Sequence, residues 1–204
     1  MITIIDYGAG NIKSIQNMLK KIGVASRISN SIDEIKVSEK LILPGVGHFD
    51  FGMKQLRKSG LVESLNQRVI EDKIPLLGIC LGAQMLGLKS EEGVEPGLGW
   101  IDMEIVHFDI NQISATNKVP NMGWNYIKPA KTSKLLDGLD ETSRFYFVHS
   151  YHMQANNLED VLCNSHYGYD FASAVASKNI YGVQFHPEKS HKFGMRLLKN
   201  FTEI

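Results

Sequence analysis

The first half of the chain alternates between short apolar runs and longer amphipathic stretches. Residues 2–5 are almost entirely apolar, and in residues 12–22 the apolar side chains recur every three or four positions, as on one face of a helix. The same pattern predicts further strands at 24–28, at 41–43 and in the run that ends at Cys80, with helices at 50–58 and 61–72. Strands that alternate with helices favour a central, mostly parallel sheet with helices on both faces.

The pattern changes after Gly97, where short runs typical of strands replace the helices. These runs lie at 100–108, 122–127, 145–148, 161–167, 172–177 and 180–185, and a last amphipathic helix is predicted at 193–201. We therefore expect antiparallel strands in the second half. No linker, repeat or low-complexity segment divides the chain, so residues 1–204 are predicted to form a single domain.

Charge and composition exclude several functions. Lys plus Arg and Asp plus Glu number 22 each, whereas a nucleic-acid-binding protein normally carries a basic excess. No run approaches the ~18 apolar residues of a membrane span, and the N-terminal segment is typical of a buried strand rather than a signal peptide. The two cysteines form neither a disulfide framework nor a zinc motif. We expect a cytoplasmic protein without nucleic-acid, membrane or metal partners.

Cys80 lies where the apolar strand breaks and helix-forming residues begin. It is flanked by Gly78 and Gly82, and the pattern G-x-C-x-G is typical of a nucleophile elbow with cysteine in place of serine. The sharp turn leaves no room for side chains at the flanking positions. The thiol would then sit at a helix N-terminus, where N–H groups favour the reactive thiolate. Cys163, in contrast, has the surroundings of an ordinary buried thiol.

His186 and Glu188 supply the groups that such a nucleophile needs. They are two residues apart in an extended segment and so lie on the same face, and Pro187 between them stiffens the turn. Glu188 would hold one ring nitrogen and leave the other to face Cys80. Cys80, His186 and Glu188 are therefore predicted to act as nucleophile, base and orienter of the base.

Attack on a carbonyl creates an oxyanion that needs at least two N–H donors. One donor is expected from Leu81, the residue after the nucleophile. The other is expected from the Val46–Gly47 backbone, in the loop P-G-V-G that closes a neighbouring strand. The glycines would also permit an inactive peptide orientation in this loop.

With these motifs the chain resembles the class I glutamine amidotransferases, and among them the glutaminase subunits of imidazole glycerol phosphate synthases. The likeness covers nearly the whole chain: D-Y-G-A-G-N at 6–11, P-G-V-G at 44–47, G-I-C-L-G-A-Q at 78–84, S-E-E-G at 90–93, M-G-W-N at 122–125, F-V-H-S-Y at 147–151 and G-V-Q-F-H-P-E-K-S at 182–190. It implies a flavodoxin-like α/β fold and a cofactor-free hydrolysis of glutamine to glutamate and ammonia.

The resemblance also implies a partner and further site residues. A (β/α)8-barrel cyclase would consume the ammonia in a heterodimer, making imidazole glycerol phosphate and aminoimidazole carboxamide ribotide in histidine biosynthesis. The positions that match glutamine-binding residues are Gly45, Gly47, Gln84, Glu92, His149, Ser150 and Tyr151. The positions that match the partner-facing surface are Asn11, Trp124 and Tyr146.

Three other functions fit parts of the sequence. Some relatives of this subunit supply ammonia for amidino groups on surface sugars, and 95–102, 189–195 and Pro120-Asn121, where histidine often precedes M-G-W-N, favour that alternative. A second alternative is a triad-bearing thiol hydrolase or peptidase on the same fold. A third is a non-catalytic binding module, which the presence of Cys80, His186 and Glu188 disfavours.

Overall fold

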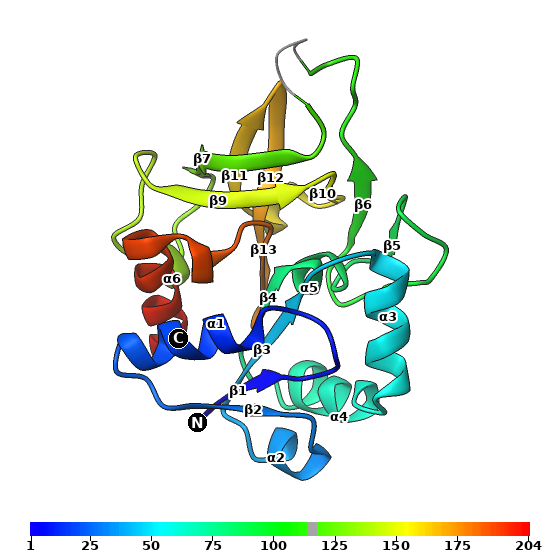
Figure 1. The fold of residues 1–204 in the computed structure, drawn as a ribbon, viewed down its shortest axis with the longest axis vertical. Coiled ribbons are helices and arrows are strands. Elements are labelled where there is room, and N and C mark those ends of the chain that lie inside the picture. The colour runs from blue at the N-terminus through cyan, green and yellow to red at the C-terminus, as the bar shows by residue number, and fades with distance from the viewer. Residues whose placement is uncertain (114–117) are drawn as a thin grey trace.

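The computed structural model describes residues 1–113 and 118–204, whose helices and strands are arranged around one large sheet (Figure 1). The strands are β1 (Ile2–Ile5), β2 (Ser26–Ser29), β3 (Lys40–Gly45), β4 (Leu76–Cys80), β5 (Lys89–Ser90), β6 (Met103–His107), β7 (Asn121–Tyr126), β8 (Lys128–Pro129), β9 (Arg144–His149), β10 (Tyr151–Ala155), β11 (Val161–Tyr167), β12 (Tyr169–Ser177) and β13 (Ile180–Val183). The α-helices are α1 (Ile12–Lys21), α2 (Ile32–Lys36), α3 (Phe49–Lys58), α4 (Val62–Asn66), α5 (Leu81–Gln84) and α6 (His191–Glu203). A π-helical turn, Gln67–Glu71, extends α4, and 3₁₀ turns lie at Lys134–Leu136, Leu158–Asp160 and Pro187–Lys189.

The large sheet joins a parallel half to an antiparallel half, as the sequence predicts. Its main path runs β2-β1-β3-β4-β13-β12-β10-β6-β5, and β11 and β8 extend it beside β12. The pairs β1–β2, β1–β3, β3–β4 and β4–β13 are parallel. The pairs β12–β13, β10–β12 and β6–β10 are antiparallel. The carboxyl ends of β3 and β4 therefore meet at one edge of the sheet, which is where open α/β sheets bind their ligands.

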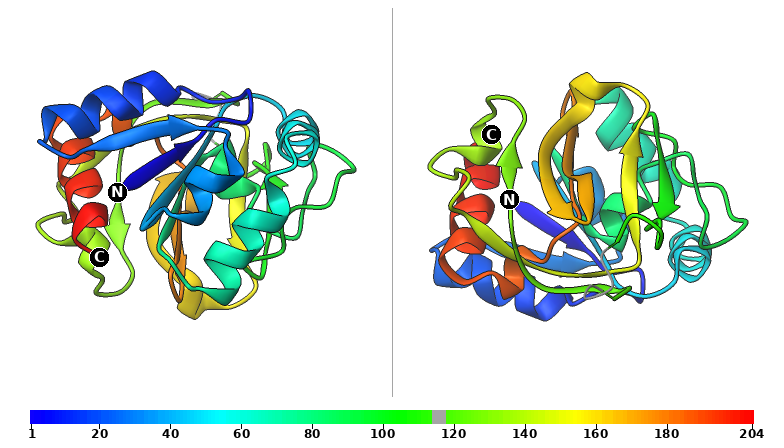
Figure 2. Two further views of the ribbon diagram at one scale, coloured as in Figure 1. Left: turned by 90° about the horizontal axis from the view of Figure 1, so that it is seen from below. Right: turned by 90° about the horizontal axis from the view of Figure 1, so that it is seen from above.

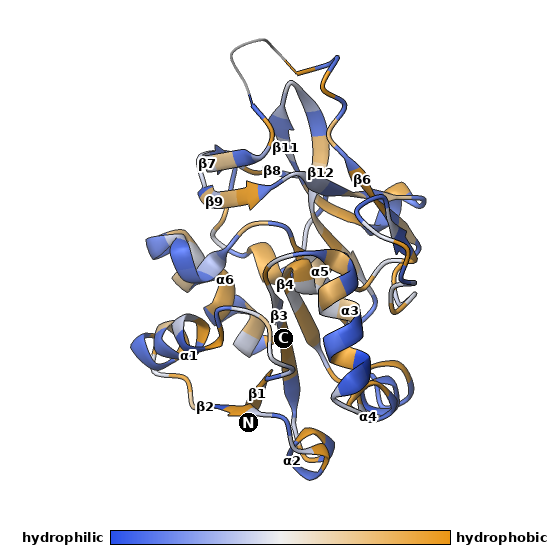
Figure 3. Cartoon of the chain, turned by 45° about the vertical axis from the view of Figure 1, so that its right-hand side comes forward, coloured by the Kyte–Doolittle hydropathy of each residue, from blue (hydrophilic) through white to orange (hydrophobic). Residues whose placement is uncertain are grey.

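The inner strands of the parallel half, β1, β3, β4 and β13, divide their side chains between two buried layers. In β1, Ile4 packs in the core layer that contains Leu19 of α1 and Phe201 of α6, whereas Ile5 packs in the layer that contains Leu56 of α3. Figure 2 shows α1 and α6 together on one side of the strands and α3 and α4 on the other. Figure 3 shows apolar strands at the centre and hydrophilic residues mainly on the helices. A sheet covered on both faces explains the near-continuous apolar runs.

A second, two-stranded sheet is formed by β7 and β9. Their antiparallel register places Met122 opposite Val148 and Trp124 opposite Tyr146. The residues of β7 alternate in burial: Met122, Trp124 and Tyr126 are exposed, while Asn121 is buried. Because β9 also bridges to His186, this sheet borders the segment that carries the predicted base.

The structure corrects several element boundaries. The strand expected at 24–28 is β2, Ser26–Ser29, because the N–H of Val24 bonds the carbonyl of Leu19 and closes α1 instead of joining the sheet. The helix expected at 61–72 is α4 followed by the π-helical turn. The strand β10 was not expected, since polar His152 and Gln154 interrupt its apolar pattern. No helix among the described residues is long and apolar enough to cross a membrane.

Candidate active site

Cys80 occupies a strained turn between β4 and α5. Its φ of 54° and ψ of −113° lie outside the regions that residues with a side chain ordinarily adopt. A β-carbon on Gly82 would lie 1.9 Å from the carbonyl oxygen of Leu43, and one on Gly78 would lie 2.8 Å from Cα of Ala83. The two glycines therefore let α5 pack directly against β3 and β4, and this packing holds the turn in place.

His186 and Glu188 form a buried pair beside this turn. His186 Nδ1 donates to Glu188 Oε1 at 2.8 Å, and both side chains are 1% exposed. The backbone N–H of His186 donates to the carbonyl of Tyr146 at 2.9 Å, which ties the segment to β9. His186 Nε2 and Glu188 Oε2 are buried and make no hydrogen bond within the described residues. Nε2 is thus left for Cys80 or a ligand.

Burial lowers the pKa of His186, but the interactions of the ring with Cys80 and Glu188 outweigh burial and raise that pKa to about 10. The ring therefore carries a proton at neutral pH and loses it only as the pH approaches about 10. The protonated ring lies beside the sulfur and can donate a proton there. The arrangement suits a nucleophile next to a general acid.

A cavity of about 310 Å³ opens over the turn. It is lined by Val46, Gly47, Cys80, Leu81, Gln84, Glu92, Val148, His149, Ser150, Tyr151, His186 and Lys189. The structure thus brings together on one cavity all the predicted catalytic, oxyanion and glutamine-binding residues except Glu188, which lies behind His186, and Gly45. Among the described residues no cluster of three or more His, Cys, Asp or Glu side chains could hold a metal ion.

Gly45 does not line the cavity, and its predicted part in glutamine binding stays a prediction. A β-carbon there would lie 2.7 Å from the backbone nitrogen of Gly82 and 2.8 Å from the hydroxyl of Tyr7. The position is glycine because β3, α5 and Tyr7 meet there.

The loop after β3 leaves open space around Gly47. Gly47 has a φ of 99° and open space where a β-carbon would stand, and the side chain of Val46 is exposed. The start of the loop is fixed, because the Tyr7 hydroxyl donates to the carbonyl of Pro44 at 2.7 Å. Burial, and then the charge of Cys80, raise the pKa of Tyr7, which keeps this hydroxyl protonated as a donor. The Val46–Gly47 peptide is the part of the loop that can turn.

The segment that carries Glu92 is bound to the first turn of α3. Glu92 Oε2 accepts from the backbone N–H of Phe49 at 2.7 Å. The carboxylate of Asp50 accepts from the backbone N–H groups of Val94 and Glu95, each at 3.0 Å from Oδ1. These bonds lower the pKa of Asp50, the N–H of Glu95 contributing most. Glu92 is therefore held at the rim of the cavity.

His149 and Gln84 use their side chains mainly to hold the protein together. His149 Nδ1 donates to the carbonyl of Tyr151 at 2.8 Å, and its Nε2 accepts from Asn121 Nδ2 at 3.1 Å. Burial lowers the pKa of His149 to about 3, so the ring is neutral. Gln84 Nε2 donates to the same carbonyl and to Gln184 Oε1, both at 3.0 Å. The His149 ring has no nitrogen left for a ligand, and Gln84 has only its oxygen.

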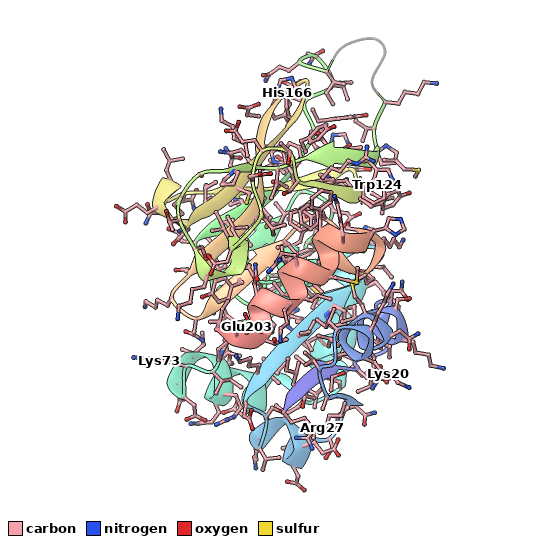
Figure 4. All side chains as sticks on the ribbon, turned by 90° about the vertical axis from the view of Figure 1, so that its left-hand side faces the viewer. Lys20, Arg27, Lys73, Trp124, His166 and Glu203 are labelled. Atoms are coloured by element: carbon pink, nitrogen blue, oxygen red, sulfur yellow. The ribbon has the colours of Figure 1, made fainter. Side chains whose placement is uncertain are left out.

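The predicted partner-facing aromatics lie together beside the cavity. The Trp124 ring stacks on His191 with centroids 5.5 Å apart and meets the edge of Tyr146 at 6.2 Å. Figure 4 labels Trp124 among the side chains of this face. Arg144 lies over Trp124, and the Lys189 nitrogen lies 5.5 Å from the Tyr146 centroid. Asn11 is half-buried at the start of α1, and α1 packs against the turn Pro187–Lys189.

Sequence reasoning missed four residues at the site. Val148 and Lys189 line the cavity, Tyr7 anchors the loop after β3, and Gln184 contacts the cysteine sulfur. Gln184 could have been found, because it is two residues before His186 in an extended segment and so shares its face. The other three contacts depend on how distant segments pack.

Comparisons with known proteins identify the family to which the chain belongs. The family model for "Glutamine amidotransferase class-I" matches residues 3–204. The chain is 55% identical to "Imidazole glycerol phosphate synthase subunit HisH 2" of Pseudomonas aeruginosa, over 100% of both chains. It is 53% identical to the protein of the same name from Methanococcus maripaludis, over 100% of this chain and 99% of the other. A solved glutamine amidotransferase structure superimposes with a TM-score of 0.75 at 20% identity, covering 100% of this chain and 98% of the other, which shows a shared fold.

Proposed function

The chain belongs to the class I glutamine amidotransferase family, and on this premise we propose that it is the glutaminase subunit of an imidazole glycerol phosphate synthase. It hydrolyses glutamine and passes the ammonia to a (β/α)8-barrel cyclase, which makes imidazole glycerol phosphate and aminoimidazole carboxamide ribotide for histidine biosynthesis. The observation that carries the proposal is the strained Cys80 turn facing the buried His186–Glu188 pair across one cavity.

The first half of the reaction is attack by the Cys80 thiolate on the side-chain amide carbon of glutamine. The carbonyl electron pair moves onto oxygen, where the N–H of Leu81 and the Val46–Gly47 backbone stabilise the oxyanion. As the tetrahedral intermediate collapses, His186 Nε2 gives its proton to the departing nitrogen. Ammonia leaves, and a glutamyl thioester remains on Cys80.

The second half hydrolyses the thioester. His186, now neutral, takes a proton from a water molecule as that water attacks the thioester carbonyl. The carbon–sulfur bond breaks, glutamate leaves, and Cys80 and His186 return to the ion pair. Glu188 accepts from Nδ1 throughout, which holds the ring in the tautomer that keeps Nε2 toward the sulfur.

Glutamine is a zwitterion, and the cavity rim offers groups for both of its charges. The carboxylate of Glu92 suits the ammonium group, as does the side-chain oxygen of Gln84. The Ser150–Tyr151 segment and Lys189 suit the carboxylate. We assign His149 a supporting role, because both of its ring nitrogens bond within the protein.

The partner-facing surface is proposed to comprise Trp124, Tyr146, Arg144, His191 and Lys189. Exposed aromatics beside basic side chains are typical of the centre of a protein interface. Ammonia is mostly protonated in neutral water, and ammonium is not a nucleophile. A partner docked beside the cavity would receive ammonia before it is protonated.

We expect the isolated chain to be a poor glutaminase. A barrel cyclase with its bound ligand should raise the rate on the order of 100-fold, which is the usual effect of one oxyanion donor on the rate. The reason is the Val46–Gly47 peptide, whose open surroundings leave its N–H free to point away from the cavity. Glutamate release is measured with the chain alone, with the barrel, and with barrel and ligand. Equal turnover in all three would contradict this part of the proposal, and hydrolysis of a peptide instead of glutamine would favour the thiol-hydrolase alternative.

The amidino-sugar alternative keeps the glutaminase chemistry and changes only the acceptor. Asn121 is a reason to keep the amidino-sugar alternative. It stands where histidine often precedes M-G-W-N, and the Asn121 side chain bonds His149. Measuring ammonia transfer with each kind of barrel separates the two acceptors. Ammonia transfer with a histidine-pathway barrel but not with a surface-sugar barrel supports the first assignment, and the reverse supports the second.

A further inference from the structure

Gln184 is a fully buried polar residue that the mechanism above does not use. It follows β13 and lies two residues before His186, with its backbone N–H donating to the carbonyl of Ser173 at 2.9 Å. Its side-chain Nε2 lies 3.8 Å from the sulfur of Cys80, within hydrogen-bond reach of a sulfur atom. Its Oε1 accepts from Gln84 Nε2 at 3.0 Å.

The neighbouring groups fix which end of the Gln184 amide faces the sulfur. The carbonyl of Tyr151 can only accept, so the end of Gln84 that meets it must be the NH₂ group. That NH₂ group also meets Gln184, whose nearer atom must therefore be oxygen. The remaining end of Gln184, its NH₂ group, faces Cys80.

We propose that Gln184 is a positioning residue that donates a hydrogen bond to the Cys80 thiolate and, being held by Gln84, keeps the sulfur aimed at the cavity. This inference rests on the proposed function and adds a second donor to the His186 imidazolium. A thiolate in a buried site is costly unless donors surround it. The motif at 182–190 thus places two side chains beside the Cys80 sulfur, those of Gln184 and His186.

The charged and titratable groups around the sulfur are few. His186 lies beside it with Glu188 behind, and Tyr7 lies beneath the turn. Glu92, His149 and Lys189 line the rest of the cavity. Gln184 adds a donor to this set that does not titrate, so its removal changes the pH dependence of the sulfur without removing a charge.

Two variants of similar shape separate donation from packing. Gln184→Met keeps the volume and removes the donor, and Gln184→Glu keeps the shape but presents a carboxylate oxygen to the sulfur. The probe is iodoacetamide alkylation of Cys80 in the full chain, followed by mass spectrometry across pH. A hydrogen bond to a charged group predicts that the pH of half-maximal alkylation rises by about one to two units in the Met variant. We expect a larger rise in the Glu variant.

An unchanged alkylation profile in the folded Met variant would overturn the inference, because a space-filling role would leave the sulfur's pH dependence intact. Should the Met variant fail to fold, Gln184→Leu, which is also neutral and lacks a donor, takes its place, because the added charge of the Glu variant raises the pH of alkylation whether or not Gln184 donates. The assay uses neither glutamine nor a partner, so it stays readable if the proposed acceptor is wrong. A wild-type Cys80 that does not react at all would overturn both the inference and the proposed function.

Discussion

Replacing Cys80 by alanine is expected to abolish glutamine-dependent synthesis, with a loss on the order of 10⁴-fold or more. Cys80 is the thiol that lines the cavity, whereas the other cysteine, Cys163, lies in β11 and is buried away from it. Synthesis from added ammonium salt by the same complex should survive, because ammonia then reaches the acceptor without the thioester. Both activities are measured on one preparation.

Cys163→Ala is the matched control for this prediction. Burial raises the pKa of the Cys163 thiol to about 12, so it is a neutral thiol at any pH used for assay. Its replacement removes one small buried group and should leave glutamine-dependent synthesis near the wild-type rate. A Cys80→Ala protein that loses ammonia-dependent synthesis as well would indicate that residue 80 supports the fold or the docking, not the chemistry.

Gly82→Ala is expected to give the largest loss of stability among single-methyl additions at the site. The new β-carbon would lie 1.9 Å from the carbonyl oxygen of Leu43 and 2.8 Å from its carbonyl carbon. These are backbone atoms of a central strand, so β3 and α5 must move apart. Overpacking of this kind costs about 3 kcal/mol, which corresponds to a melting temperature lower by about 6–12 °C for a chain of this size.

Gly60→Ala tests whether the collision, and not the loss of a glycine, causes the effect. Gly60 has a φ of 73° and nothing within 4 Å of its would-be β-carbon, so only backbone strain opposes the substitution. That strain costs about 1 kcal/mol, or about 3 °C in melting temperature. Thermal unfolding followed by circular dichroism compares the two variants. A Gly82→Ala protein as stable as Gly60→Ala would mean that α5 does not pack on β3 as described.

The elements that the sequence predicts well are those whose pattern is local. The apolar run of β1 and the helical period of α1 each suffice to identify an element. The turn at Cys80 was equally predictable, because the pattern G-x-C-x-G is typical of a nucleophile elbow. The structure shows the turn as a positive φ at Cys80. At these positions residue type and backbone geometry determine each other directly.

Other features depend on packing between distant segments and leave no local pattern. The strand β10 was missed because polar His152 and Gln154 interrupt its apolar pattern, although His152 is buried against Phe108 and bonded to the hydroxyl of Tyr169. Gly45 also has a packing role that the sequence does not reveal, since a β-carbon there would meet the backbone of Gly82. His149 and Gln84 line the cavity as expected, yet their hydrogen bonds turn inward. The catalytic and glutamine-binding roles remain predictions that the experiments above address.

Labelling with a glutamine-like diazo-ketone tests most directly whether Cys80 is the nucleophile of a glutamine site. The wild-type protein, with its barrel partner, is incubated with the reagent and digested, and each cysteine peptide is weighed by mass spectrometry. We predict one adduct on Cys80, none on Cys163, protection by excess glutamine, and a strong loss of labelling in His186→Ala. An unlabelled Cys80, or labelling that neither glutamine nor the loss of His186 diminishes, would contradict the proposed site.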